Sequence, residues 1–467
     1  MTVRSVLLGL LGAVLICGCA FFNDRILKQT FLVGNNMPVS VYGALILFVL
    51  FLNPLMKRWA LKGRELAVIL AITLAACCIP AAGLLRCFTS SLILPHKYNQ
   101  EKDGWRDQKV LELAPKQMLA DISQNEDEVL TGFVQGMGKG DEHMPFGKIP
   151  WYGWTRTLLF WLPLILTIWA ALVALSVVLH RQWSQHEHLP YPIATFTNAL
   201  LPEKGRAGSG LFHSRLFWIG MLGVLIIHLN NFTHEWFPDY VIQVTRQIDL
   251  TALSPLVPTF IKGGGWSLLK PTIFFCVIGI AYFVPTDASL SFGLGPYVWA
   301  VIVGTFAGYG MDLNGAVEGA DAYTALTPRA FVLFGANVGV LVAILYTGRH
   351  YYSAVMRRSL GLRVKGGADR TGVWACRVFL VLMALFVVQL VLVGLDWQLA
   401  VLYSAVALLF FAVMARIIAE TGLFYMQPYF FPCLVLWGLF GVGALGAKSL
   451  LIMQLVTMVL LIDPRET

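Results

Sequence analysis

The segment from His180 to Leu200, which reads HRQWSQHEHLPYPIATFTNAL, gathers side chains that could do chemistry beside a helix break. Pro190 and Pro192 each lack a backbone N–H, and each disfavours the helical conformation in the residue before it. We therefore predict that one helix ends here and a second begins, with free N–H groups and partial positive charge at the new N-terminus. Thr195 and Asn198 add a hydroxyl and an amide to its first turns.

Glu187 precedes this break and lies between His186 and His188. Nearby histidines make zinc conceivable, but His186 and His188 are two residues apart and do not share a helical face. We predict a break at the cytoplasmic end of a helix, without a metal, a cofactor or catalytic residues.

A second charged position is Arg416 with Glu420, in the stretch ARIIAETGLFYMQ at the end of an apolar helix. Residues four apart on a helix face each other, so we expect an ion pair, which lowers the cost of keeping both charges near a membrane. The pair can be structural or act as a gate, and we favour a functional role.

Two further stretches interrupt apolar blocks. In YFVPTDASLSFGLGP, Asp287 follows Pro285 between two short blocks, which indicates either a discontinuous transport helix or a simple helix cap in a turn. In GYGMDLNGAVEGADAYT, acidic groups among glycines could bind a cation or carry a proton, although a plain external loop is favoured. The polar residues of this second stretch are Asp312, Asn314, Glu318 and Asp321.

The composition and the length of the apolar blocks indicate what kind of element positions these residues. Of 467 residues, 57% are hydrophobic and 13% are charged, and the mean hydropathy is +0.70, which excludes a soluble globular enzyme. Apolar blocks of about 18 to 25 residues match the length that a helix needs to cross a bilayer. We predict an all-α, polytopic integral membrane protein of about twelve transmembrane helices, some of them broken or re-entrant.

The expected crossings include an uncleaved first helix, because the start of the chain has no obvious signal-peptide cleavage site. They run over residues 3–22, 38–55, 66–85, 151–179, 216–229, 271–284, 290–307, 330–346, 374–395, 398–418, 430–445 and 450–461. We divide the chain into N-terminal helices (1–96), an extracytoplasmic amphipathic segment (97–150) and a transport core (151–467). The charged segment is either a cap over an outer vestibule or a solvated connector.

Basic loops give the orientation. Counting crossings places three basic clusters and Arg4 on one side, which the positive-inside rule makes cytoplasmic. The formal net charge of +8 is thereby explained without a nucleic-acid partner. We expect a multi-pass protein of the inner membrane with a cytoplasmic N-terminus. The clusters are Lys57, Arg58, Lys62 and Arg64; Arg181, Lys204, Arg206 and Arg215; and Arg349, Arg357, Arg358, Arg363, Lys365 and Arg370.

Several of these stretches together resemble an uncharacterised bacterial membrane family related to the oligopeptide-transporter superfamily. They are RSVLLGLLGAVLICGCAFFND, MPVSVYGALILFVLFLNPLM, WSQHEHLPYPIATFTNALL, FVPTDASLSF and ARIIAETGLF. The resemblance implies a helical transporter of repeated halves for small peptides or metal chelates, often driven by protons. It also implies that Leu189–Pro192, Glu187 and Glu420 belong to the transport core. Such proteins usually continue with further spans, so we expect a truncated chain or one without a closing helix pair.

The leading hypothesis is a secondary active transporter rather than an enzyme, moving a small peptide, metal chelate or other small polar solute. No GxxxxGK[ST] loop is present in the sequence, so we expect an ion or proton gradient to supply the energy. Candidate carriers are Glu420, Glu187 and Asp287. The alternatives are a membrane-embedded enzyme acting on a lipid-linked substrate and a non-transporting scaffold. A homo-oligomer is left open.

Overall fold

The computed structural model describes residues 2–28, 31–33, 38–80, 84–137, 145–203, 208–313, 326–363, 369–423, 426 and 430–461. Throughout these residues the regular structure is helical, apart from an isolated bridge between Gln247 and Thr272. The all-α class is thus confirmed for the described chain.

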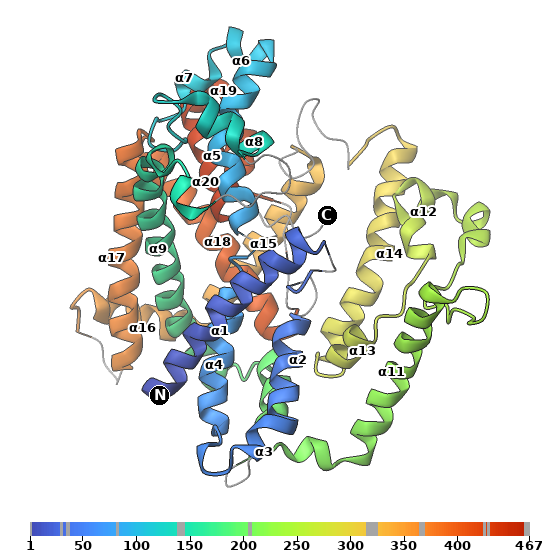
Figure 1. The fold of residues 1–467 in the computed structure, drawn as a ribbon. Coiled ribbons are helices and arrows are strands. Elements are labelled where there is room, and N and C mark those ends of the chain that lie inside the picture. The colour runs from blue at the N-terminus through green and yellow to red at the C-terminus, as the bar shows by residue number, and fades with distance from the viewer. Residues whose placement is uncertain are drawn as a thin grey trace.

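An N-terminal group of helices forms one side of the main body (Figure 1). Helix α1 packs along α4, and Tyr42 of α2 is among the fully buried side chains of this group. The helices are α1 (Val3–Phe21), α2 (Val39–Leu47), α3 (Asn53–Leu55) and α4 (Gly63–Ala76).

The core lies among long helices that follow later in the chain. Helices α9 and α17 pack closely along each other, and buried Trp161, Phe386 and Phe410 join α9, α17 and α18 in one apolar cluster. Such burial stabilises each large side chain by about 1.5 to 3 kcal/mol. The helices are α9 (Trp151–Arg181), α15 (Pro328–Thr347), α16 (Arg349–Ser359), α17 (Arg370–Val393) and α18 (Trp397–Thr421).

The charged segment forms a cap at the upper end of the molecule (Figure 1). The helices that follow α5 in this segment are short. Residues 118–122 of the expected amphipathic segment are not helical, and the carbonyls of Met118 and Leu119 accept hydrogen bonds from side chains of α9. Met118 and Val129 are buried, as their apolar character requires. The elements are α5 (Leu84–Glu101), α6 (Asp103–Asp107), α7 (Val110–Leu113), a π-helix (Asp127–Thr131) and α8 (Gly132–Gln135).

Helices α19 (Pro432–Leu445) and α20 (Ala447–Leu460) form a hairpin beside α18. Phe431, just before α19, stacks on Phe410 in the middle of α18, whereas Lys448 at the turn lies beside Gly394 at the end of α17. Fourteen residues rise only about 21 Å as a helix. The hairpin therefore runs between the middle of α18 and the end of α17, and α19 is kinked at Gly441, where φ is 75°.

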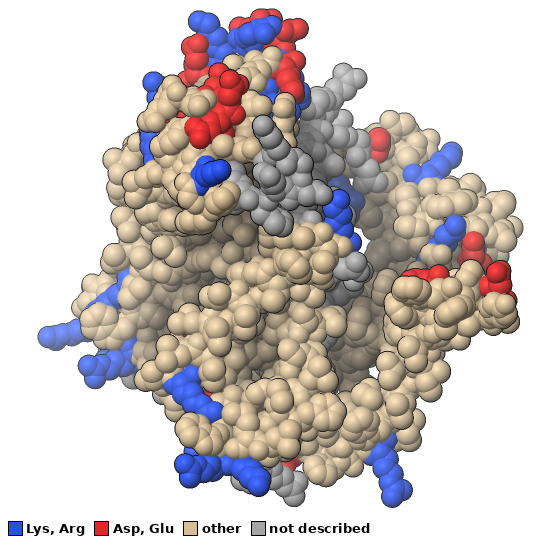
Figure 2. Space-filling view, viewed as in Figure 1, with Lys and Arg blue, Asp and Glu red and all other residues tan. Residues whose placement is uncertain are grey.

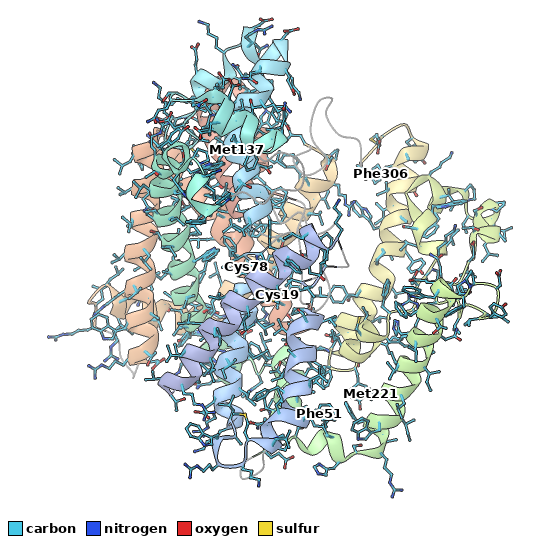
Figure 3. All side chains as sticks on the ribbon, in the orientation of Figure 1. Cys19, Phe51, Cys78, Met137, Met221 and Phe306 are labelled. Atoms are coloured by element: carbon cyan, nitrogen blue, oxygen red, sulfur yellow. The ribbon has the colours of Figure 1, made fainter. Side chains whose placement is uncertain are left out.

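A lobe of helices stands beside the main body (Figure 1). It holds α11 (Arg215–Trp236), α12 (Pro258–Lys262), α13 (Phe275–Ala281) and α14 (Thr286–Gly308). Many of its large apolar side chains are exposed, and Figure 3 shows two of them, Met221 on α11 and Phe306 on α14. Exposed apolar surface of this extent is typical of helices that face lipid.

Among the described residues, seven helical segments are long and apolar enough to cross a membrane. The five other expected crossings are shorter or interrupted in the structure; 271–284, for example, contains only the seven-residue α13. The number of twelve is therefore not confirmed. The segments are Val3–Asp24, Trp151–His186, Arg215–Trp236, Thr286–Gly308, Pro328–Thr347, Arg370–Val393 and Trp397–Thr421.

The two ends of the molecule differ in charge. The N-terminus, α3 and α16 lie at the lower end, and α6 and α7 lie at the upper end (Figure 1). Figure 2 shows mainly Lys and Arg at the lower end and charges of both signs at the upper end. The first and third basic clusters thus share an end with the N-terminus in the described residues. Lys204, Arg206 and Lys365 of the expected clusters lie outside the described residues.

Candidate functional site

The break predicted from Pro190 and Pro192 is present at the lower end of α9. The helix continues as a π-helix (Gln182–His186), and α10 (Pro192–Leu200) begins with its proline at the first position. Between them, His188 and Tyr191 adopt left-handed backbone angles, with φ of 52° and 43°. Non-glycine residues rarely hold such angles unless surrounding contacts fix them.

Arg416 of α18 binds two carboxylates at this break. Its guanidinium forms an ion pair with Glu187, and Nε lies 3.3 Å from Oε2 of Glu420. The side chains of Arg416 and Glu187 are 16% and 10% exposed, whereas that of Glu420 is 44% exposed. The pair expected from the spacing of Arg416 and Glu420 is therefore present, and Glu187 extends it to a triad with one positive and two negative formal charges.

Neighbouring side chains hold the buried part of this triad. The Gln182 amide donates to Oε1 of Glu187 at 3.1 Å, so both oxygens of Glu187 are engaged. The Trp183 ring lies 5.5 Å from the guanidinium carbon of Arg416, within the range of a cation–π contact. Glu187 and Arg416 are thus fixed from several sides, whereas Glu420 has the 3.3 Å contact to Arg416 and faces more solvent.

The end of α18 also contacts the start of α10 through the backbone. The Tyr191 N–H donates to the Ala419 carbonyl at 3.1 Å. Gly422, which caps α18 with φ of 70°, lies against Pro192: a Cβ atom added to Gly422 would stand 2.6 Å from Cβ of Pro192. Glycine tolerates this positive φ and, because it has no Cβ atom, allows the close approach to Pro192.

A cavity of about 800 Å³ lies next to the triad, between α4, α9, α10 and α18. Ala415 and Ala419, the neighbours of Arg416 on α18, form part of its wall. The lining is mostly apolar, with aromatic Trp183 and a few groups able to form hydrogen bonds. This size and lining are typical of small-molecule sites. The polar lining residues are Ser176, His180, Tyr191, Thr197 and Asn198.

The residues selected from the sequence for the site lie at or near the helix break, with one exception. Glu187, Pro192, Arg416 and Glu420 meet at the break, and Asn198 lines the cavity. The exposed Pro190 accepts a hydrogen bond at its carbonyl from the Thr195 hydroxyl, at 3.1 Å.

Asp287 is the exception. It lies exposed in the first turn of α14, where a carboxylate is favourable at a helix N-terminus. Of the third stretch, Asp312 is described, and Asn314, Glu318 and Asp321 lie outside the described residues.

Three aromatic side chains of the site were not selected from the sequence. Nε1 of Trp183 and the hydroxyl oxygens of Tyr351 and Tyr352 are buried. Burial, and then the negative charge of Glu187, raise the pKa of Tyr352, so this hydroxyl stays protonated. No local pattern singles these residues out, because an aromatic side chain near a helix end looks like an ordinary core or interface residue in the sequence.

The described residues contain no group of three or more His, Cys, Asp or Glu placed to hold a metal ion. Residues 1–467 match the model of a family of unknown function, DUF6785. The chain belongs to this family. No curated protein and no solved structure matches it.

Proposed function

We propose that this protein is a secondary active transporter of the inner membrane, coupled to protons or ions, whose coupling group is the triad of Glu187, Arg416 and Glu420. The observation that carries the proposal is one guanidinium shared by two carboxylates, at a helix break, beside a cavity of about 800 Å³. Charged side chains that are buried at the ends of apolar helices, as Glu187 and Arg416 are, cost free energy and often belong to a transport pathway.

Protonation gives the triad a way to couple a gradient to movement. With both carboxylates ionised its formal charge is −1, and one proton brings it to zero. We assign the proton to Glu420, because its side chain is 44% exposed and therefore open to solvent, whereas that of Glu187 is 10% exposed. Glu187 is held by both Gln182 and Arg416, so its role is to anchor the guanidinium.

The cavity is proposed as the inner solute site. Its hydrogen-bonding groups and aromatic wall suit a small peptide or another small polar solute with an apolar part. The resemblance to a family related to the oligopeptide-transporter superfamily is in keeping with the same class of solute. We assign Asn198 and Tyr191, which line the cavity, as groups that contact it.

Uptake into proteoliposomes tests the proposal. Radiolabelled di- and tripeptides are offered with and without an inward proton gradient, for the wild type, Glu420→Gln and the control Asp239→Asn, which changes an exposed carboxylate outside the site. We expect gradient-dependent uptake in the wild type and the control and its loss in Glu420→Gln. Absence of gradient-dependent flux for every peptide, with Glu420→Gln behaving as wild type, would contradict it.

The orientation is part of the proposal. We place the lower end, with α3, α16 and the triad, in the cytoplasm, because basic residues gather there. Alkaline phosphatase fused after Asp107 should be active outside the inner membrane, and a fusion after Gly361 should be inactive. The opposite pattern would reverse the assigned topology.

A further inference from the structure

A second cavity, of about 500 Å³, lies at the opposite end of the molecule from the triad. Its walls come from α5, from α6 and α7 of the cap, and from α20 of the C-terminal hairpin. Tyr98 and Trp105 form one side, with ring centroids 5.5 Å apart and an edge-on arrangement. Two segments more than 300 residues apart in the sequence thus enclose one space.

The lining of this upper cavity contains hydrogen-bonding groups but no charged side chain. Ser90 and Ser91 contribute hydroxyls. Pro95, within α5, has no N–H to offer the carbonyl of Ser91 four residues earlier, which leaves that acceptor without its helical donor. The walls otherwise are apolar, so an uncharged ligand avoids the cost of an unpaired buried charge.

Gln454 is the polar group on the α20 side. Its Oε1 accepts a hydrogen bond from the Cys433 thiol at 3.1 Å, which orients the side chain and turns the two amide N–H groups away from Cys433. An amide held in this way can donate to a carbonyl of a ligand in the cavity that Gln454 lines.

Helix α18, which lines the lower cavity, contacts α20, which lines the upper cavity. Tyr403, near the start of α18, shares a hydrogen bond of 3.0 Å with Thr457 of α20, while Ala415 and Ala419, near its end, line the lower cavity. The buried apolar cluster that includes Phe410 and Phe431 lies between these two levels of α18.

We propose that the upper cavity is a binding site for a neutral solute with an aromatic or apolar body and an amide or hydroxyl group. We further assign it as the outer station of the transport route, and this assignment rests on the proposed function. The binding site itself does not, because its residues are distinct from the triad.

Three probes that share the phenylalanine side chain and differ in net charge separate the effect of charge on binding from the effect of shape. At about pH 6, N-acetyl-phenylalaninamide is neutral, N-acetyl-phenylalanine is an anion and phenylalaninamide is mainly a cation. Equilibrium dialysis of each radiolabelled probe against the protein in nanodiscs, with empty nanodiscs as the blank, measures binding. We expect saturable binding of the neutral probe and binding of both charged probes that is weaker by about tenfold or more.

Variants that fill the cavity with a larger side chain, introduced on two different helices, test where the probe binds. Ser91→Trp on α5 and Leu111→Trp on α7 should abolish binding of the neutral probe. Their matched controls are Thr89→Trp and Glu112→Trp, which add the same side chain at neighbouring residues that do not line the cavity, and both should retain it. Gln454→Leu, which changes little volume, should weaken binding several-fold while leaving the circular dichroism spectrum unchanged.

Equal binding of neutral and charged probes would overturn the proposal, and so would binding that survives both Ser91→Trp and Leu111→Trp. A co-purified phospholipid detected by mass spectrometry in the wild type and lost in both filled variants would also overturn it, since the cavity would then be a lipid site. Asp239→Asn, at an exposed carboxylate that lines neither cavity, should leave probe binding unchanged. Probe binding without any gradient-dependent uptake would contradict the transport proposal alone.

Discussion

The backbone N–H of Tyr191 donates a hydrogen bond to the carbonyl oxygen of Ala419, with N···O of 3.1 Å. Together with the contact of Gly422 with Pro192, this bond joins the break after α9 to the last turn of α18. It holds Glu187 and Arg416, four residues before Tyr191 and three before Ala419, at ion-pairing distance. The geometry of the triad therefore depends on how two helix ends meet.

Gly422→Ala should disturb this junction. The substitution places a Cβ atom 2.6 Å from Cβ of Pro192 at a residue with φ of 70°, and strain of this kind costs about 1 to 3 kcal/mol. We expect a lower free energy of unfolding, measured in nanodiscs or by SDS titration. Gly223→Ala, in α11 with no atom near its added Cβ, is the control and should change little.

Arg416→Leu should destabilise the protein strongly, because it leaves the carboxylate of Glu187, only 10% exposed, without its cation. Loss of one partner from a buried ion pair costs about 3 to 5 kcal/mol. The double variant Glu187→Gln with Arg416→Leu should recover part of that loss. Additive effects in this double-mutant cycle would show that the two side chains are not coupled.

Stability at low pH should depend on Asp369. A hydrogen bond from Arg181, with further backbone N–H donors at the start of α17, holds the pKa of Asp369 below its ordinary value. A lowered pKa contributes stability above the pKa of the unfolded chain, and that contribution is lost as the pH falls through the folded pKa. We expect Asp369→Asn to lower the melting temperature at neutral pH.

The difference between the wild type and Asp369→Asn should then shrink as the pH is lowered from 7 into the acid range. The exposed Asp239→Asn serves as the comparison. A difference that stays constant over this range would show that the carboxylate charge of Asp369 is not the source of the stability.

The cap should loosen when its two buried anchors on α9 are removed. Thr157 donates to the Leu119 carbonyl at 2.5 Å, and Trp161 Nε1 donates to the Met118 carbonyl at 3.1 Å. Thr157→Val leaves a buried acceptor unpaired, at a cost of about 1 to 3 kcal/mol. Faster hydrogen exchange over residues 114–123 is expected in Thr157→Val and not in Thr155→Val, whose hydroxyl bonds within α9.

The sequence alone determined the features that depend on composition or on spacing within one helix. Apolar blocks of bilayer length predicted an all-helical protein with membrane-spanning segments, because hydropathy is a property of composition. Pro190 and Pro192 predicted the helix break through their missing N–H groups. Arg416 and Glu420 could be paired because four residues make slightly more than one helical turn.

Only the tertiary structure decided which distant segments meet. Glu187 is 229 residues from Arg416, and no local pattern in the chain specifies that the end of α9 lies against the end of α18. Local pattern likewise does not show that Asp287, which resembles the other candidates in sequence, lies apart from them on α14. Nor does it show that Gln454 and Ser91 line one cavity, which they do because α20 packs on α5. Such contacts are set by how helix faces pack, which hydropathy and residue spacing do not encode.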